Sequence, residues 1–299
     1  MDGNGRLLRF GVFTVAAAGA AMAGCTSLAS GADTAQELVP DDPHWGCLTK
    51  PIAPPPLLDP VPSNLVYALP IFDFRILPPA VIPQLTVRAC QIQDYPCSKA
   101  VGLVLSPVDT PAQVYGTAFQ TPVYPIVMPY AVDAYIRITA PDYLPLEYYL
   151  GGPLLGARSN LVMNNLTVVP GLQVTPITAI DADNLASGVQ TTRNPDAAII
   201  AMRTLDCTDQ PAEGVTLSLS VKAVPFTFLT GLPTLSALPT TERALAGFAN
   251  IEVPKGSFIN VTVEGTAPNG IAYGKINLTV RGGQVTQGDI RPDVSQFGF

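Results

Sequence analysis

The chain has 299 residues, enough for two domains of ordinary size, and 47% of them are hydrophobic while 13% are charged. This composition provides a packed core and argues against wholesale disorder. The net charge of −7, without a basic cluster, argues against nucleic acid as a partner. The 31 Pro and 25 Gly residues interrupt the chain at short intervals, which suits many short strands and predicts an all-β protein.

Residues 1–24 are predicted to be a secretory signal peptide. Arg6 and Arg9 provide a charged start, and an uninterrupted apolar segment follows over residues 10–23. This segment is too short to span a bilayer, and no later segment approaches the required length. Attachment to a membrane would therefore need an anchor other than a membrane-spanning segment.

Such an anchor is suggested by the end of the signal, where Ala21 to Cys25 reads Ala-Met-Ala-Gly-Cys. The stretch resembles bacterial lipoprotein signals, in which a Leu-Ala-Gly-Cys-like box precedes an acylated cysteine. The resemblance implies a lipid on Cys25 as the membrane anchor. It also implies sorting to the outer membrane, because Thr26 stands where Asp commonly marks inner-membrane retention. The alternative is an ordinary signal peptide in which Cys25 is incidental.

Residues 25–64 are predicted to be a Pro-rich tether with an extended, semi-rigid course. It contains the only His and the only Trp of the chain, in the stretch His44-Trp45-Gly46-Cys47. One interpretation makes His44 and Cys47 a base and a nucleophile. The favoured one makes the stretch a local anchor, with Trp45 packed on a domain and Cys47 in a disulfide, because free thiols do not persist in oxidising compartments.

Four cysteines follow Cys25, and an even count in an exported chain favours disulfides over metal or redox chemistry. Cys90 and Cys97 are close enough in sequence to close a local loop. That pairing would leave Cys47 and Cys207 to each other. Their bond would join the leader, the part of the Pro-rich tether that contains Cys47, to the second domain. The sequence alone does not determine this connectivity.

Two blocks of strands, residues 65–176 and 194–299, can be aligned with each other. Three expected strands correspond in order and character: 65–74, 85–89 and 135–139 in the first block, and 198–205, 215–219 and 258–262 in the second. This repetition predicts two tandem antiparallel β-sandwiches of the Ig-like type, separated by a connector over residues 177–193.

The second block carries the clearer motif. Thr241-Glu242, Gly247-Phe248 and the stretch Val253-Pro254-Lys255-Gly256-Ser257-Phe258 resemble the pattern of carboxypeptidase regulatory-like domains. The resemblance implies a prealbumin-like sandwich. At the Pro-x-Gly corner, Pro sets φ and Gly accepts a positive φ. The stretch Arg281-Gly282-Gly283-Gln284 predicts a hairpin that joins residues 275–280 to 285–290.

No catalytic residue, metal site or cofactor is predicted. The regulatory-like domains are non-catalytic parts of zinc peptidases, and a single His cannot supply the usual His-rich zinc site. The sequence has neither a Gly-x-Ser-x-Gly elbow nor a phosphate-binding glycine loop.

The connector contains Asp181, Asp183 and Asn184, which suggest either a calcium site or the start of a helix. An EF-hand loop would need a third ligand and a Gly where Leu185 and Ala186 stand. A short helix over 181–188, capped by Asp183 or a neighbour, is the favoured prediction.

Tyr143, Tyr148 and Tyr149 are the candidate ligand contacts. Tyr148 and Tyr149 share a predicted strand and must point to opposite faces, so at least one of them has a chance of facing solvent. Exposed Tyr could stack on sugars, by analogy with starch-binding-like modules of related fold, but packing in the core or at its rim, without a ligand, is the favoured interpretation.

These observations predict a non-catalytic, lipid-anchored binding or scaffold protein of the cell envelope. Its partner would be an envelope protein or a polysaccharide. The second hypothesis is a glycan-binding module that uses Tyr residues of the first block, and an enzyme is the third.

Overall fold

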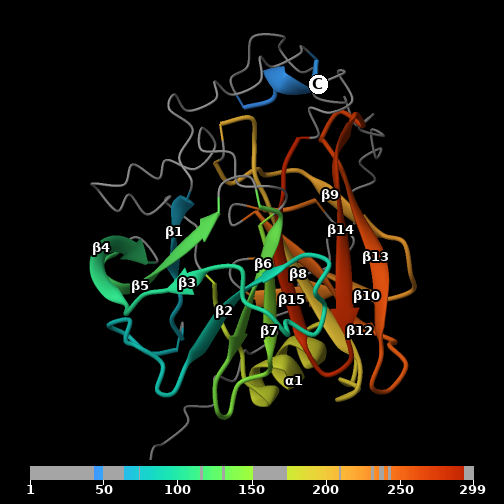
Figure 1. Ribbon diagram of the computed structural model, residues 1–299. Helices are drawn as coiled ribbons and strands as arrows, with labels where there is room; N and C mark the ends of the chain where they lie inside the picture. Colours follow the sequence, from blue (N-terminus) through green and yellow to red (C-terminus); the bar gives the residue numbers. More distant parts are fainter. Residues whose placement is uncertain are drawn as a thin grey trace, which may run out of the picture. The chain divides into compact units, whose positions relative to one another are not determined.

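The computed structural model describes residues 44–49, 64–73, 75–114, 117–129, 132–150, 174–208, 210–229, 232–235, 239–241 and 244–292. All belong to one compact unit that extends from Ala35 to Phe299. They form mainly strands, with the short 3-10 helix η1 (Gly46–Leu48) and the helix α1 (Ala179–Gly188) (Figure 1). The predicted all-β class is confirmed. The signal peptide, Cys25 and most of the tether lie outside the described residues.

Three sheets contain the strands. In the first sheet, β5 (Thr117–Pro129) pairs with β1 (Asn64–Pro70), β3 (Leu103–Val104) and β4 (Val108–Val114). The third sheet has the order β14 (Ala272–Arg281), β13 (Phe258–Thr266), β9 (Thr216–Leu219). The central sheet has the order β11 (Leu232–Leu235), β10 (Val224–Leu229), β12 (Leu245–Ile251), β8 (Ala198–Thr204), β15 (Val285–Ile290), β7 (Leu146–Tyr149), β6 (Ala134–Thr139), β2 (Thr86–Gln91).

The central sheet contains strands of both predicted domains. Strands β2, β6 and β7 come from the first block, and β8, β10, β11, β12 and β15 come from the second. The last strand, β15, lies between β7 and β8 and runs parallel to both, with Val285 opposite Leu146 on one side and Ile199 on the other. The sheet is therefore mixed, where the sequence predicted only antiparallel pairing.

Each half of the central sheet is packed against another sheet. One core cluster combines β1 and β5 with β2, β6 and β7, and a second combines β9, β13 and β14 with β8 and β12. The two clusters lie on opposite faces, because Tyr148 belongs to the first and its neighbour Tyr149 to the second. Two sandwiches are thus joined edge to edge through a shared sheet. Whether residues 65–176 and 194–299 are separate folding units stays a prediction.

The strands that repeat in the sequence also pair in the same way in the two halves of the molecule. The second and third strands of each set pair antiparallel, as β2 with β6 in the first half and as β9 with β13 in the second. In each half the first strand of the set, β1 or β8, belongs to the facing sheet. Alternating strands need this arrangement, because each buries one face against a neighbouring layer.

Two predicted turns have different outcomes. Gly256 has a φ of 71°, and the Ser257 N–H donates to the Pro254 carbonyl at 3.0 Å, as expected for the Pro-x-Gly corner. The hairpin prediction is wrong, because β14 pairs with β13 whereas β15 enters the central sheet. The turn instead carries the chain between sheets. A Cβ at Gly282 would lie 2.4 Å from the Asp196 carbonyl oxygen, so Gly is needed there.

The connector forms α1, as predicted, but Asp183 is not its cap. Thr178 is the N-cap: its hydroxyl accepts from the Asp181 N–H at 3.2 Å, and the Asp181 carboxylate accepts from the Thr178 N–H at 2.8 Å. Asp183 pairs with Arg193 at 2.6 Å. In the described ranges, no three His, Cys, Asp or Glu residues are grouped to hold a metal ion. Those ranges also contain no helix with the length and apolar character that a membrane crossing requires.

Candidate functional site

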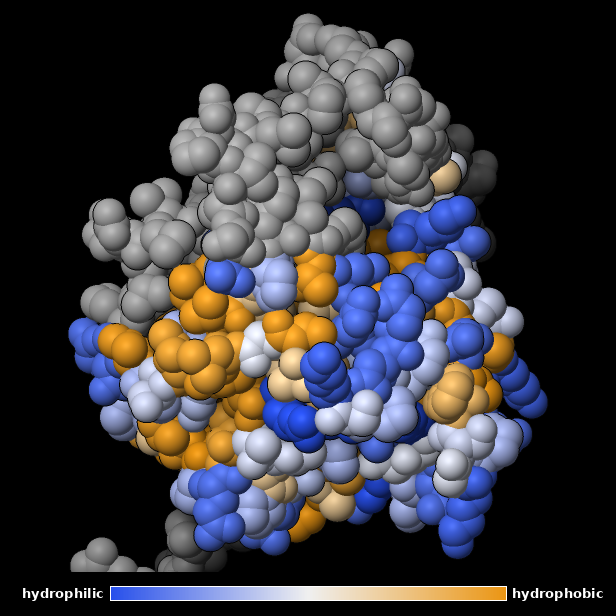
Figure 2. All heavy atoms as spheres, viewed as in Figure 1, coloured by the Kyte–Doolittle hydropathy of each residue, from blue (hydrophilic) through white to orange (hydrophobic). Residues whose placement is uncertain are grey.

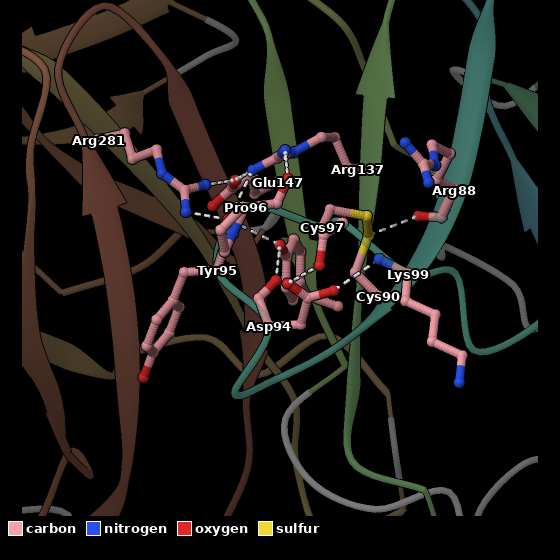
Figure 3. Close-up of a disulfide and its surroundings, with 12 residues drawn as sticks. Arg88, Cys90, Asp94, Tyr95, Pro96, Cys97, Lys99, Arg137, Glu147 and Arg281 are labelled. Carbon is pink, nitrogen blue, oxygen red and sulfur yellow. Dashed lines mark hydrogen bonds and ion pairs between the residues drawn. A yellow bond between two sulfur atoms is a disulfide. The ribbon is translucent and has the colours of Figure 1, made fainter.

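A surface loop between β2 and β3 is closed by a disulfide between Cys90 and Cys97 and is held by several side-chain hydrogen bonds. Both cysteines are buried. Figure 3 shows this loop below a group of charged side chains that come from β6, β7 and β14. The loop is therefore a contact between the first half of the molecule and the third sheet.

A buried carboxylate lies at the centre of this group. The Glu147 side chain is 2% exposed, and its Oε1 lies 2.5 Å from the Nη2 of Arg137, which is opposite it across the β6–β7 pair. Arg281, from β14, binds the same oxygen with its Nη1. In Figure 3 the two arginines approach Glu147 from opposite sides. Because a buried carboxylate is stable only with such partners, Glu147 links the central sheet to the third sheet.

The same arginines hold the backbone of the disulfide loop. Arg137 donates to the Pro96 carbonyl at 2.7 Å and to the Tyr95 carbonyl at 3.0 Å, and Arg281 also donates to the Tyr95 carbonyl. The hydroxyl of Tyr135 donates to the Asp94 carbonyl at 2.9 Å. Three successive carbonyls of the loop are thus fixed by side chains rooted in two sheets. The bonds from the two arginines are stronger than hydrogen bonds between neutral groups, because their donors are charged.

The Asp94 side chain closes the loop from within. It accepts from the Lys99 backbone N–H at 2.8 Å and from the Ser98 hydroxyl at 2.9 Å. The bond from Lys99 is the main reason that the pKa of Asp94 lies below its usual range. The disulfide, the two arginines and the Asp94 carboxylate together hold the backbone of this loop in one conformation.

This loop presents one aromatic side chain to the third sheet. The Tyr95 ring lies 4.9 Å from the Phe258 ring, centroid to centroid, with 34° between the planes. The Arg281 guanidinium carbon lies 5.9 Å from the Phe258 ring centroid. Phe258 is 41% exposed, and Tyr95 is half-buried. In Figure 3 the Tyr95 side chain points away from the two arginines.

The leader is attached at a second place. Cys47 is bonded to Cys207, and the Cys207 N–H donates to the His44 carbonyl at 3.1 Å. His44 also binds Asp206 through Nδ1, and the Trp45 ring lies 6.1 Å from the Tyr273 ring. This is the local anchor that was favoured. His44 and Cys47 do not form a base and nucleophile, because the sulfur is in a disulfide.

The bond from His44 matters for the charge state of its partner. Burial by itself would raise the pKa of Asp206, but the bonds from His44, Gln210 and Thr208 outweigh burial and lower it. Asp206 is thus held as an anion under the leader.

The expected exposure of Tyr148 or Tyr149 is wrong. They are 3% and 2% exposed, because the central sheet is covered on both faces at β7. Tyr148 donates to Asp289 at 2.9 Å and Tyr149 to the Thr279 carbonyl at 3.2 Å. Tyr143 is half-buried and donates to Asp73 at 2.6 Å. These three candidates do not form one surface.

A buried ion pair was missed by the sequence reasoning. Arg203 of β8 binds Asp289 of β15 with Nε at 3.0 Å and Nη2 at 2.7 Å, and both side chains are at most 10% exposed. Tyr148 and the nearby Tyr67 border the pair, and burial raises the pKa of Tyr67 to about 12. Arg203 within the mainly apolar strand β8 was the available signal, whereas β15 also contains Thr286 and Gln287, so Asp289 did not stand out.

Comparison with known proteins adds no relative: no family model matches the chain, and no curated protein matches it. Its function must be argued from the residues described above.

Proposed function

We propose that the protein is a non-catalytic, lipid-anchored binding or scaffold protein of the cell envelope. The observation that carries the proposal is the sequence Ala21-Met22-Ala23-Gly24-Cys25 after a charged start and an apolar segment. The anchor would be a lipid on Cys25, and the outer membrane would be its location. The two disulfides support export, because such bonds persist in oxidising compartments.

The attachment of the leader supports a tethered arrangement. Because His44 and Cys47 are bound to the body, the spacer that begins after Cys25 extends only to residue 43. Fully extended, residues 26–43 would reach about 60 Å. The predicted tether over 25–64 is thus divided, and the body would be held at a limited distance from the membrane.

The bonding of the buried carboxylates supports a binding role rather than a catalytic one. Glu147, Asp289, Asp73 and Asp206 each accept bonds from a cationic side chain or from His44, so their oxygens are engaged in holding the fold. The resemblance of residues 241–258 to carboxypeptidase regulatory-like domains, which are non-catalytic, points the same way. Glycan binding through Tyr148 and Tyr149 is not favoured, because both are buried.

The anchor is tested by Cys25→Ser in the full chain. We expect this variant to leave the membrane fraction, because a single acylated cysteine is the proposed attachment. Thr26→Ser is the matched control and should stay membrane-bound, with a lipid-modified N-terminal peptide by mass spectrometry. Recovery of Cys25→Ser in the membrane pellet at the wild-type level would contradict the anchor.

A further inference from the structure

The outward side of the third sheet has a distinct surface. On β13 and β14, Val261, Val263, Leu278 and Val280 belong to the core, so the alternate positions face away from it. We call these positions the outer face; they are Phe258, Asn260, Thr262, Glu264, Lys275, Asn277, Thr279 and Arg281, of which Thr279 is buried and the others are exposed or half-buried. In the common view of Figures 1 and 2, hydrophilic residues gather on the side of β13 and β14, and hydrophobic ones around β3.

Between Phe258 and the Glu264–Lys275 pair, amide and hydroxyl side chains line the outer face. The Thr279 hydroxyl donates to Asn260 Oδ1 at 3.0 Å, and the Thr262 hydroxyl donates to Asn277 Oδ1 at 2.8 Å. These bonds fix both amide side chains and occupy their oxygens. The amide NH₂ groups of Asn260 and Asn277 make no hydrogen bond within the described part of the chain, so two oriented donors remain for a ligand.

The end of this face that contains Phe258 is already rigid before any ligand binds. Phe258 stacks with Tyr95, and the Tyr95 backbone is fixed by the Cys90–Cys97 disulfide and by bonds from Arg137 and Arg281. A ligand that stacks on these rings would not have to order a flexible loop, which lowers the entropic cost of binding. Among the large hydrophobic side chains whose exposure is described, Phe258 is the only exposed aromatic one.

The charges near this face favour an uncharged ligand. Arg281 is occupied by Glu147 and by the Tyr95 carbonyl. Glu264 and Lys275 are opposite each other at the far end of the β13–β14 pair, so their charges balance. A sugar ring has apolar C–H faces that fit an aromatic ring, and hydroxyl edges that fit amides and hydroxyls. A protein partner of ordinary size would need a broader apolar centre than two rings.

We propose that the outer face, beginning at the Tyr95–Phe258 pair, binds an uncharged polysaccharide chain laid along β13 and β14. This rests on the proposed envelope-binding function and names its ligand class. It moves glycan binding from the buried Tyr148 and Tyr149 to residues that solvent reaches.

The test is affinity electrophoresis of the detergent-solubilised full chain in gels that contain soluble starch, hydroxyethyl cellulose or dextran. Alginate serves as the charged polysaccharide. We expect at least one uncharged polymer to retard the wild type. Phe258→Ala and Tyr95→Ala should each weaken retention about tenfold or more, as for central aromatic contacts elsewhere, and Asn260→Ala should weaken it less. Ile271→Ala is the matched control, since Ile271 is 36% exposed and lies off the outer face.

Several results would overturn the proposal: no retardation by any of the three uncharged polymers, retardation by alginate alone, or retardation that neither aromatic substitution changes. Thermal melts check that the variants are folded, and exposed Phe258 should tolerate Ala with little change. Membrane fractionation of Cys25→Ser is independent of these gels. A failed sugar test with an intact anchor would therefore reject this site without rejecting the tethered protein.

Discussion

At the scale of single residues, the described part of the chain places several carboxylates under cationic side chains. Asp73 is an example: its side chain is 1% exposed and accepts from Arg75 Nε at 2.9 Å and from the Tyr143 hydroxyl at 2.6 Å. The bond from Arg75 is the main cause that lowers the pKa of Asp73 to about 2, against an opposing effect of burial. Such a shift links the protonation of Asp73 to stability.

We expect Asp73→Asn to lower the free energy of unfolding at pH 7 by about 2 kcal/mol, because the pKa shift corresponds to about 2.5 kcal/mol at about 1.4 kcal/mol per pKa unit, and solvent around the 39% exposed Arg75 side chain screens part of it. Because the pKa is lower in the folded state, Asp73 stabilises above its unfolded pKa near 3.8, and that contribution is lost as the pH falls toward about 2. The difference between variant and wild type should therefore shrink over this range. Urea denaturation at several pH values measures it.

The control for this experiment is Asp196→Asn, which changes an exposed aspartate. It should change stability little at any pH. A difference between Asp73→Asn and wild type that stayed constant from pH 7 to pH 2 would show that charge is not its cause.

At the scale of elements, the two disulfides are expected to contribute differently to stability. Cys90 and Cys97 are 7 residues apart and hold one loop, whereas Cys47 and Cys207 are 160 apart and fasten the leader to the loop that follows β8. In the chain-entropy model a longer closed loop restricts the unfolded chain more. The local bond should therefore matter for loop order, and the distant bond for global stability.

We expect Cys47→Ala/Cys207→Ala to destabilise the protein by about 5 kcal/mol and Cys90→Ala/Cys97→Ala by about 2.5 kcal/mol. The second double variant should also raise amide hydrogen exchange at residues 91–98, since the arginine bonds alone would hold that loop. Denaturation and hydrogen exchange of both double variants measure these effects. A larger loss of stability for the local bond would contradict this division of roles.

At the scale of the whole described unit, β15 joins the two sandwiches. It pairs with β7 on one side and β8 on the other, and Tyr135 and Tyr149 of the first block lie in the core cluster of the second. Isolating the second block would turn β15 into an edge strand and uncover the residues beneath α1: Ile199, Phe226 and Ala249.

The repeat in the sequence leads to the expectation that residues 194–299 fold alone with a cooperative melt. The shared sheet leads us to expect that this fragment melts well below residues 44–299 and aggregates more readily. Residues 177–299, which include α1, should be intermediate. All three would carry Cys207→Ser, with Cys47→Ser, Cys90→Ala and Cys97→Ala in the longest, so that none of them contains a disulfide. Calorimetry of the three compares them; equal melting temperatures would contradict coupling through β15.

Local sequence features determined much of this protein. The strands and the corner at Gly256 follow from side-chain periodicity and from φ preferences, which involve few neighbouring residues, and a helix was expected over 181–188, although its cap at Thr178 was not. The short spacing of Cys90 and Cys97 likewise made their pairing foreseeable. These signals act over short stretches, so no knowledge of the distant chain is needed to interpret them.

Only the tertiary structure decided which strands are neighbours. A turn with two glycines suits a hairpin as well as a passage between sheets, and the choice depended on whether β7 and β8 left an edge for β15. The sheets packed over both faces of β7 buried Tyr148 and Tyr149, and the packing of the third sheet brought Arg281 to Glu147 across 134 residues of sequence. The candidate ligand surface moved to Tyr95 and Phe258 for that reason: exposure depends on the layers packed over a strand, and a strand's own sequence does not contain them.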